Sequence, residues 1–163
     1  MSKAKRLILH YLNTDLDIRA NISFAQLARR FRKAGMSELY YAPAHAKGLR
    51  WKWYGSYEVG WAWGKKGEHP QHTLRAFIKV LERLSPAELK EWRRCGSKMF
   101  NIGYQSGKNP PAVKSAALVN ELSCDLLKTI TEYGAGIVLT IYSDKVPPLI
   151  RRQRPLKERA RRH

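Results

Sequence analysis

Two segments, one near each end of the chain, share the same order of elements, and this order constrains the fold more than any other feature. In the first segment, apolar residues recur at helical spacing over residues 24–31, and Gly35 stands where a left-handed helix stop is expected. Residues 36–42 then have a composition typical of a strand, and residues 6–12 and 16–20 ahead of the helix are also candidates for extended structure. The pattern predicts a strand–helix–strand unit.

The second segment repeats this order toward the end of the chain. A helical pattern begins after Ser123, Gly134 provides the stop, and residues 137–142 are rich in β-branched side chains. Residues 98–104 ahead of the helix are a strand candidate. Two strand–helix–strand units in one chain indicate an α+β fold.

Helix starts are marked by capping boxes, in which a Ser or Thr and a Glu or Gln three residues later satisfy the free backbone N–H groups. Ser23 with Gln26 predicts such a start for the first helix. Ser85 with Glu88 predicts a second one, strengthened by a proline at the first helical position. An apolar stripe over residues 72–84 predicts a further helix between the two units.

The dipeptide Gly55-Ser56 separates two aromatic-rich stretches, residues 49–54 and 57–63. Two-residue turns of this kind join antiparallel strands, so a central hairpin is expected here. Together these elements predict a mainly antiparallel sheet with helices packed on one face, around a central hairpin and helices. The split ferredoxin-like topology is the arrangement that fits them best.

The charge of the chain limits its partners. Lys and Arg number 31 against 13 Asp and Glu, a formal net charge of +18, which favours an anionic partner. Residues 1–147 are expected to form a single α+β domain, followed by a basic Arg-rich tail at 148–163. Two cysteines, no secretory pattern and no apolar run long enough to span a membrane make the cytoplasm the expected compartment.

The order of elements between Leu16 and Ser143 resembles the small bacterial domain of unknown function family 4279. The resemblance rests on an early Leu-Asp-Ile strand, a Trp-containing segment, a Leu-Ser-Pro helix start, an Asn-Ile-Gly-Tyr-Gln strand, and the closing pattern from Leu122 to Tyr142. It implies no catalytic residues. Some members of that family are suspected to act as immunity-type proteins beside toxins, so the resemblance implies a protein-binding role as an alternative.

The expected hairpin provides the first candidate binding surface. With Gly55-Ser56 as the whole turn, strand alternation places a basic and aromatic set of side chains on one face. Such a face is typical of platforms on which bases stack while cations hold phosphates. The alternative is a structural one, in which Arg50 stacks on Trp61 across the strands. The face consists of Arg50, Lys52, Tyr54, Tyr57, Val59, Trp61 and Trp63, and all of these except Val59 are candidate binding residues.

Further cations add to this surface. The first helix has a cluster of four cationic side chains with no acidic residue beside them. Such a cluster favours phosphate contacts over a plain solvated face. Lys65 and Lys66 follow the hairpin. The helix cluster consists of Arg29, Arg30, Arg32 and Lys33. The candidate cations of the tail are Arg151, Arg152, Arg154, Arg159, Arg161 and Arg162.

Candidates for catalysis are weaker. His69 and His72 could pair as acid and base in an RNA-cleaving site, but Pro70 between them favours entry into a helix. Asp15 and Asp17 have the spacing of a metal-binding pair, and a turn or strand end is the preferred interpretation. No zinc-type cysteine spacing, phosphate-loop motif or dinucleotide fingerprint occurs in the sequence, so neither a metal nor a cofactor is expected.

The sequence therefore predicts a non-enzymatic nucleic-acid-binding protein, with RNA or single-stranded DNA favoured over duplex. The binding surface would combine the hairpin face, the basic helix and the Arg-rich tail. The alternative is an immunity-like or inhibitor protein that covers an acidic site on a toxin, nuclease or defence complex.

Overall fold

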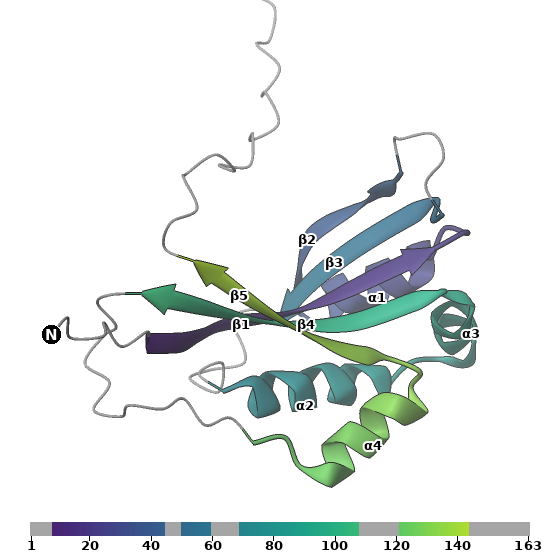
Figure 1. Cartoon of the computed structure of the whole chain (residues 1–163). Helices are drawn as coiled ribbons and strands as arrows, with labels where there is room; N and C mark the ends of the chain where they lie inside the picture. Colours follow the sequence, from purple (N-terminus) through teal and green to yellow (C-terminus); the bar gives the residue numbers. More distant parts are fainter. Residues whose placement is uncertain (1–7, 45–49, 60–68, 108–120, 144–163) are drawn as a thin grey trace, which may run out of the picture.

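The computed structural model describes residues 8–44, 50–59, 69–107 and 121–143. These residues form five strands and four helices around one core (Figure 1). In chain order the elements are β1 (Ile8–Ala20), α1 (Ala25–Lys33), β2 (Met36–Pro43), β3 (Trp53–Val59), α2 (Pro70–Leu81), α3 (Pro86–Arg94), β4 (Ser97–Gly107), α4 (Cys124–Glu132) and β5 (Gly136–Ser143). The α+β class expected from the sequence is confirmed.

The strands form one sheet in the order β2-β3-β1-β4-β5. The first four strands pair antiparallel throughout, with β3 inserted between β1 and β2, and β1 inserted between β3 and β4. This is the split arrangement of a ferredoxin-like fold. The second predicted strand–helix–strand unit extends it: β5 returns after α4 and pairs parallel to β4, as a crossover helix requires.

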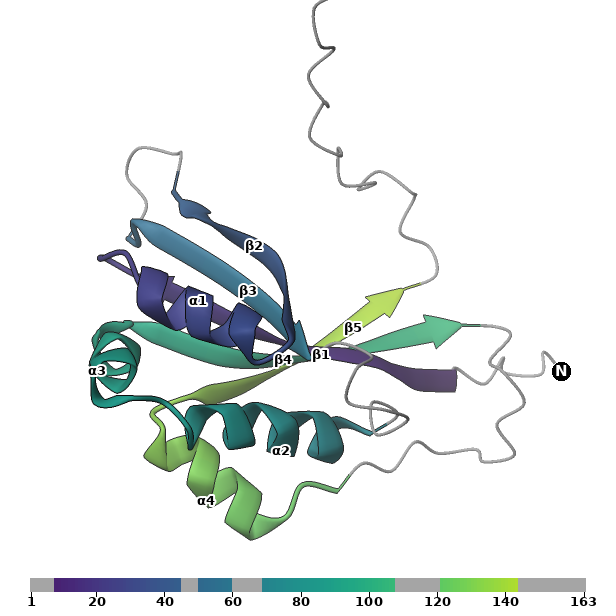
Figure 2. The same cartoon turned by 180° about the vertical axis from the view of Figure 1, so that it is seen from behind.

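The helices cover one face of the sheet, as expected, while the other face is open (Figures 1 and 2). Alternation along β1 shows this division. Leu16 and Ile18 are buried in the core. The alternate residues of the same strand, Asp15 and Asp17, point to the open face and are only half-buried. The core extends from β1 through buried aromatic residues of β3, α2 and β4, including Phe77 and Phe100, whose ring centroids are 5.4 Å apart.

Several predicted helix ends are confirmed. The Ser85 and Glu88 capping box opens α3, and the Ser123 side chain accepts a hydrogen bond from the backbone N–H of Leu126 at the start of α4. The residues that end α1 and α4, Gly35 and Gly134, have φ of 83° and 64°, the left-handed conformation that glycine adopts without a Cβ clash.

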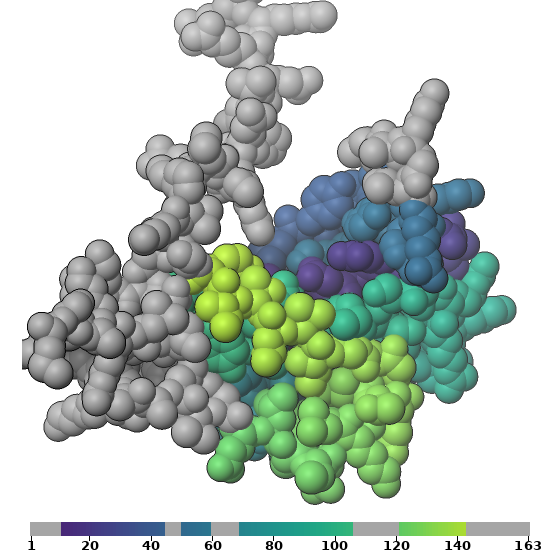
Figure 3. Space-filling model, viewed as in Figure 1, coloured from purple at the N-terminus to yellow at the C-terminus, as the bar shows by residue number. Residues whose placement is uncertain are grey.

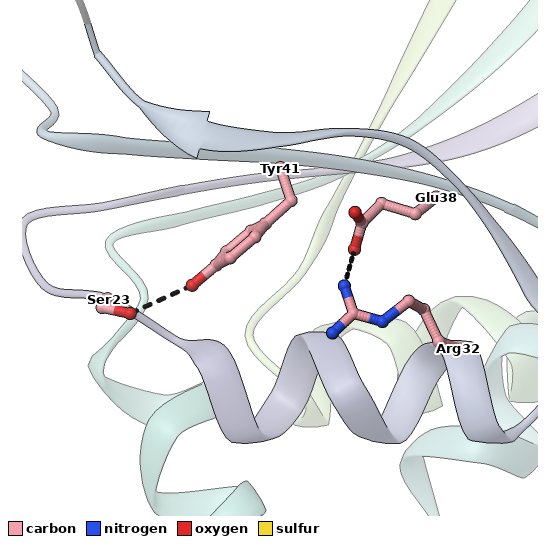
Figure 4. Close-up of polar contacts among 4 residues, drawn as sticks. All are labelled: Ser23, Arg32, Glu38 and Tyr41. Carbon is pink, nitrogen blue, oxygen red and sulfur yellow. Dashed lines mark hydrogen bonds and ion pairs between the residues drawn. The ribbon is translucent and has the colours of Figure 1, made fainter.

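The predicted capping box of α1 is wrong. The Ser23 hydroxyl lies 3.0 Å from the Tyr41 hydroxyl of β2 and caps no backbone group (Figure 4). The backbone N–H of Leu27 is satisfied from another helix: it donates to the Glu91 carboxylate of α3 at 2.9 Å. A tertiary contact therefore replaces the local cap, because α1 and α3 pack side by side.

β1 differs from the two short strands expected at 6–12 and 16–20. The described part is one continuous strand, and a register shift between Tyr11 and Asn13 accommodates the extra residue Leu12. Asp15 and Asp17 consequently lie within the strand, so their assignment to a turn or strand end is wrong.

The predicted Gly55-Ser56 turn is also wrong. Both residues lie in the middle of β3, where Gly55 pairs with Ile18 on one side and Tyr41 on the other. A Cβ at Gly55 would lie 3.0 Å from the Phe24 ring, so glycine is needed here for close packing rather than for a turn. The hairpin that does form joins β2 to β3.

Among the described residues, no helix combines the length and apolar character needed to cross a membrane. Cys95, which is buried, and Cys124, which is exposed, are free thiols.

Candidate nucleic-acid interface

The described surface contains a shallow hollow of about 460 Å³ between α1 and the turn that joins α2 to α3. Four of its lining side chains are cationic, and one is a carboxylate. The remaining two, from Gln26 and Ser85, carry hydrogen-bonding groups. The lining residues are Gln26, Arg29, Arg30, Lys33, Arg83, Ser85 and Glu88.

The amphipathic pattern of α1 places its cations at this hollow. Leu27 and Phe31 are fully buried against the core, which turns the opposite side of the helix toward solvent. Arg29 and Lys33 are four residues apart, so they lie one turn apart on the same exposed face, and both line the hollow. α1 therefore contributes a row of cations rather than scattered ones.

Arg30 is fixed in place by the neighbouring turn. Its Nη2 donates to the backbone carbonyl of Arg83 at 3.1 Å, which ties α1 to the α2–α3 connection. Its Nε is buried and has no hydrogen-bond partner among the described residues. A buried donor without an acceptor is costly, and this one belongs to a side chain that lines the hollow.

Among the described residues that line the hollow, the one carboxylate is already engaged. Glu88 accepts a hydrogen bond from the backbone N–H of Ser85 at 2.7 Å, and the Ser85 hydroxyl accepts one from the backbone N–H of Glu88. This capping box holds the negative charge at the start of α3, where it balances the helix end. Arg29, Lys33 and Arg83 form no ion pair within the described residues, so the hollow keeps an excess of positive charge.

Arg32 does not join the other cations of the first helix. Its Nη1 lies 2.6 Å from the Glu38 carboxylate of β2, on the side of α1 that faces the sheet edge (Figure 4). The predicted cluster is therefore divided: three members line the hollow and the fourth is paired elsewhere.

The predicted hairpin face does not exist as one surface, because its register depended on the Gly55-Ser56 turn. Tyr57 is fully buried with its ring 4.9 Å from Phe31, and desolvation raises the pKa of its hydroxyl. Tyr54 points to the opposite, open face, where the Arg19 guanidinium lies 5.9 Å from its ring. The two tyrosines therefore belong to different sides of the sheet.

The remaining members of that face precede β3 or lie outside the described residues. Arg50 and Lys52 are exposed, and the Arg50 guanidinium lies 4.8 Å above the ring of Trp51; its predicted stacking partner Trp61 lies outside the described residues. Their contribution to binding stays a prediction. The predicted cations and aromatics outside the described residues are Trp61, Trp63, Lys65, Lys66, Arg151, Arg152, Arg154, Arg159, Arg161 and Arg162.

The open face of the sheet has carboxylates at its centre. Asp15 of β1 and Glu58 of β3 are opposite each other in the register of the two strands. Asp17 lies two residues further along β1, on the same face. In RNA-binding sheets of related shape, the central strands present stacking aromatics at such positions. Carboxylates repel phosphates, so we place the candidate interface on the helical side.

His69 and His72 lie at the start of α2, as their spacing predicts. His69 is the N-cap residue, and its Nδ1 accepts a hydrogen bond from the backbone N–H of Gln71 at 3.2 Å. The two imidazole rings are 5.6 Å apart. Among the described residues, no group of three His, Cys, Asp or Glu side chains is arranged to hold a metal ion.

Sequence reasoning missed Arg83, Gln26 and Ser85 as parts of the site. Arg83 lies in a short connection between two helices, and its role depends on the packing of α1 against α3. The local sequence carries no signal for that packing.

Comparison with known proteins gives no match to this chain among family models, curated proteins or solved structures. The similarity to domain of unknown function family 4279 consequently stays a prediction.

Proposed function

We propose that this protein binds RNA or single-stranded DNA without catalysing a reaction, and that the hollow beside α1 holds phosphates of the backbone. The observation that carries the proposal is the convergence of Arg29, Arg30, Lys33 and Arg83 at a surface whose only carboxylate is tied into a helix cap. Guanidinium and ammonium groups are the usual partners of phosphate oxygens. The net charge of +18 acts in the same direction by attracting polyanions from a distance.

The shape of the hollow supports a single strand over a duplex. A single strand can bend its backbone into a concave surface, whereas duplex DNA is stiff over lengths of roughly 50 nm. Gln26 and Ser85 beside the cations can hydrogen-bond to sugar or base edges of a strand that enters the hollow.

The composition of the hollow supports binding rather than catalysis. Metal-independent cleavage of RNA needs a proton donor and acceptor close to the phosphate. The described residues of the lining include no histidine, and their one carboxylate is engaged with Ser85. We extend the proposal to the chain as a whole: it functions without a cofactor and acts in the cytoplasm.

The test is the salt dependence of binding, measured by fluorescence anisotropy with labelled single-stranded RNA, single-stranded DNA and duplex DNA of one sequence. The double variant Arg29→Gln and Lys33→Gln removes two cations from the hollow. Each lost phosphate contact lowers the slope of log affinity against log salt by about 0.7 for a single strand, so the slope should fall by about 1.4.

Arg32→Gln is the matched control, because it removes one cation from the same helix on the side paired with Glu38. Its slope should stay close to that of the wild type. Equal slopes for the double variant and the control would show that the hollow holds no phosphate. If nuclease-treated protein instead binds an acidic protein stoichiometrically, and the double variant loses that partner, the inhibitor-like function replaces the one proposed.

A further inference from the structure

The two edges of the sheet differ in how they are protected against pairing with another strand. At one edge, β2 contains Glu38, ends at Pro43 and has a register shift between Glu38 and Tyr40. Charges, prolines and bulges are the devices that keep an edge strand from adding a further strand. β5, at the other edge, has the sequence GIVLTIYS with no charge and no proline, and its pairing with β4 is regular.

β5 also exposes apolar side chains on both faces. Leu139 is 65% exposed and Ile141 is 59% exposed on the helical side, and Val138 is 40% exposed on the open side. Four of the seven large apolar side chains that are exposed in the described residues lie on this one strand; Tyr142 is the fourth. In the space-filling view the strand lies at the molecular surface, in yellow-green (Figure 3). An exposed apolar edge strand is a template for strand addition.

We propose that the β5 edge pairs antiparallel with the β5 edge of a second copy of this chain, to form a continuous sheet across a two-fold axis. With the axis at Thr140, Leu139 faces Ile141 of the second copy. Val138 likewise faces Tyr142 of the second copy. Both pairs combine side chains from the same side of the sheet, and such β-branched and aromatic pairs stabilise neighbouring strands.

The distribution of charge favours a second copy as the occupant. A chain with a net charge of +18 repels its own copies over most of its surface, so two copies can approach only where the charge is low. Residues 121–143, which include β5 and α4, contain one Lys and three acidic residues. The edge with the exposed apolar strand therefore also lacks a basic excess.

The size of the contact sets the expected strength. The exposed side chains of β5 and its backbone edge would bury on the order of 1,000 Å² in total, which is at the low end for specific interfaces. We therefore expect a reversible dimer at protein concentrations on the order of 100 μM. Salt should strengthen it, because screening weakens the repulsion between the two positively charged copies.

The test is sedimentation velocity of nuclease-treated protein over a range of protein and salt concentrations. The wild type should form dimers increasingly as either concentration rises. The variant with Leu139→Lys and Ile141→Lys should sediment as a monomer with an unchanged melting temperature, because both side chains are already exposed. Tyr40→Lys, an exposed residue on the opposite edge, is the matched control and should still dimerise.

A cross-link tests the register directly. Antiparallel partners have Cα atoms about 4.5 to 5.5 Å apart, within the range of a disulfide. In a Cys124→Ser background, Thr140→Cys should give a cross-linked dimer on oxidation, and Ser37→Cys on β2 should not. A wild type that stays monomeric, a dimer that dissociates as salt rises, or equal cross-linking at both edges would overturn the proposal. A dimer that dissociates as salt rises would indicate copies bridged by nucleic acid that survived the nuclease treatment, which leaves the proposed function intact.

Discussion

The hydrogen bond from the Leu27 backbone N–H to Glu91 makes a strong prediction about what stabilises α1. Leu27 is the third residue of the helix, so its N–H is one of the donors that no intrahelical carbonyl can satisfy. The bond is 2.9 Å long and partly buried, and its acceptor is a carboxylate near the positive end of the helix. Replacing Glu91 by Ala removes the acceptor and the charge together.

The expected loss follows from these features. A hydrogen bond to a charged group contributes about 1.5 to 3 kcal/mol, and loss of a helix cap typically costs about 1 kcal/mol. We expect Glu91→Ala to lower the free energy of unfolding by about 2 kcal/mol. For a chain of this size that corresponds to a fall in Tm of about 4 to 8 °C. Glu91→Gln keeps an acceptor oxygen without the charge, so its effect should be smaller, about 1 kcal/mol.

Urea unfolding at equilibrium, followed by circular dichroism and tryptophan fluorescence, measures these differences. Ser23→Ala is the informative comparison, because its hydroxyl contacts only the Tyr41 hydroxyl at an exposed position. We expect it to cost less than about 0.5 kcal/mol. If Ser23→Ala costs more than Glu91→Ala, α1 is capped by its own sequence, and the argument for a tertiary cap is refuted.

Three other positions give distinct expectations. Tyr57→Phe removes a buried hydroxyl that has no hydrogen-bond partner among the described residues, so urea unfolding should show unchanged or increased stability; a loss above about 1 kcal/mol would contradict this. Gly134→Ala should cost about 1 to 2 kcal/mol, because a left-handed φ of 64° opposes a Cβ; an unchanged unfolding curve would contradict this. Burial raises the pKa of Cys95 to about 11, so at pH 8 iodoacetamide should modify Cys124 alone; stability should decline above pH 9, as the unfolded chain ionises this thiol first.

The sequence predicted those elements whose signals are local. Periodicity and glycine stops placed α1, α4 and their following strands, because both signals act within a few residues. The Ser85 capping box and the His69-Pro70 helix entry were also predicted, since each helix start satisfies its own free N–H groups.

The errors arose where tertiary packing decided between local options. Gly55-Ser56 has the composition of a turn, yet β3 continues through it because both residues pair with β1 and β2, while the Phe24 ring fills the space beside Gly55. Sequence alone does not show that space. The error placed Tyr54 and Tyr57 on one face, whereas residues three apart in a continuous strand lie on opposite faces.

The candidate site was predicted in part for the same reason. Arg29, Arg30 and Lys33 were found because they cluster on one helix. Arg32 belongs to the same run, but its partner Glu38 comes from β2, and only the fold brings the two together. Arg83 joins the site through a carbonyl contact with Arg30 that no sequence pattern encodes.

The carboxylates on the open face give the described part of the molecule an electric dipole. Asp15, Asp17 and Glu58 lie on one side of the sheet, and the cations of the hollow lie beyond the helices on the other. In the field of a phosphate chain, these two sets of charges experience opposite forces and so exert a torque on the protein. Taken alone, these described charges would turn α1 toward the phosphates, and this effect would vanish at high salt.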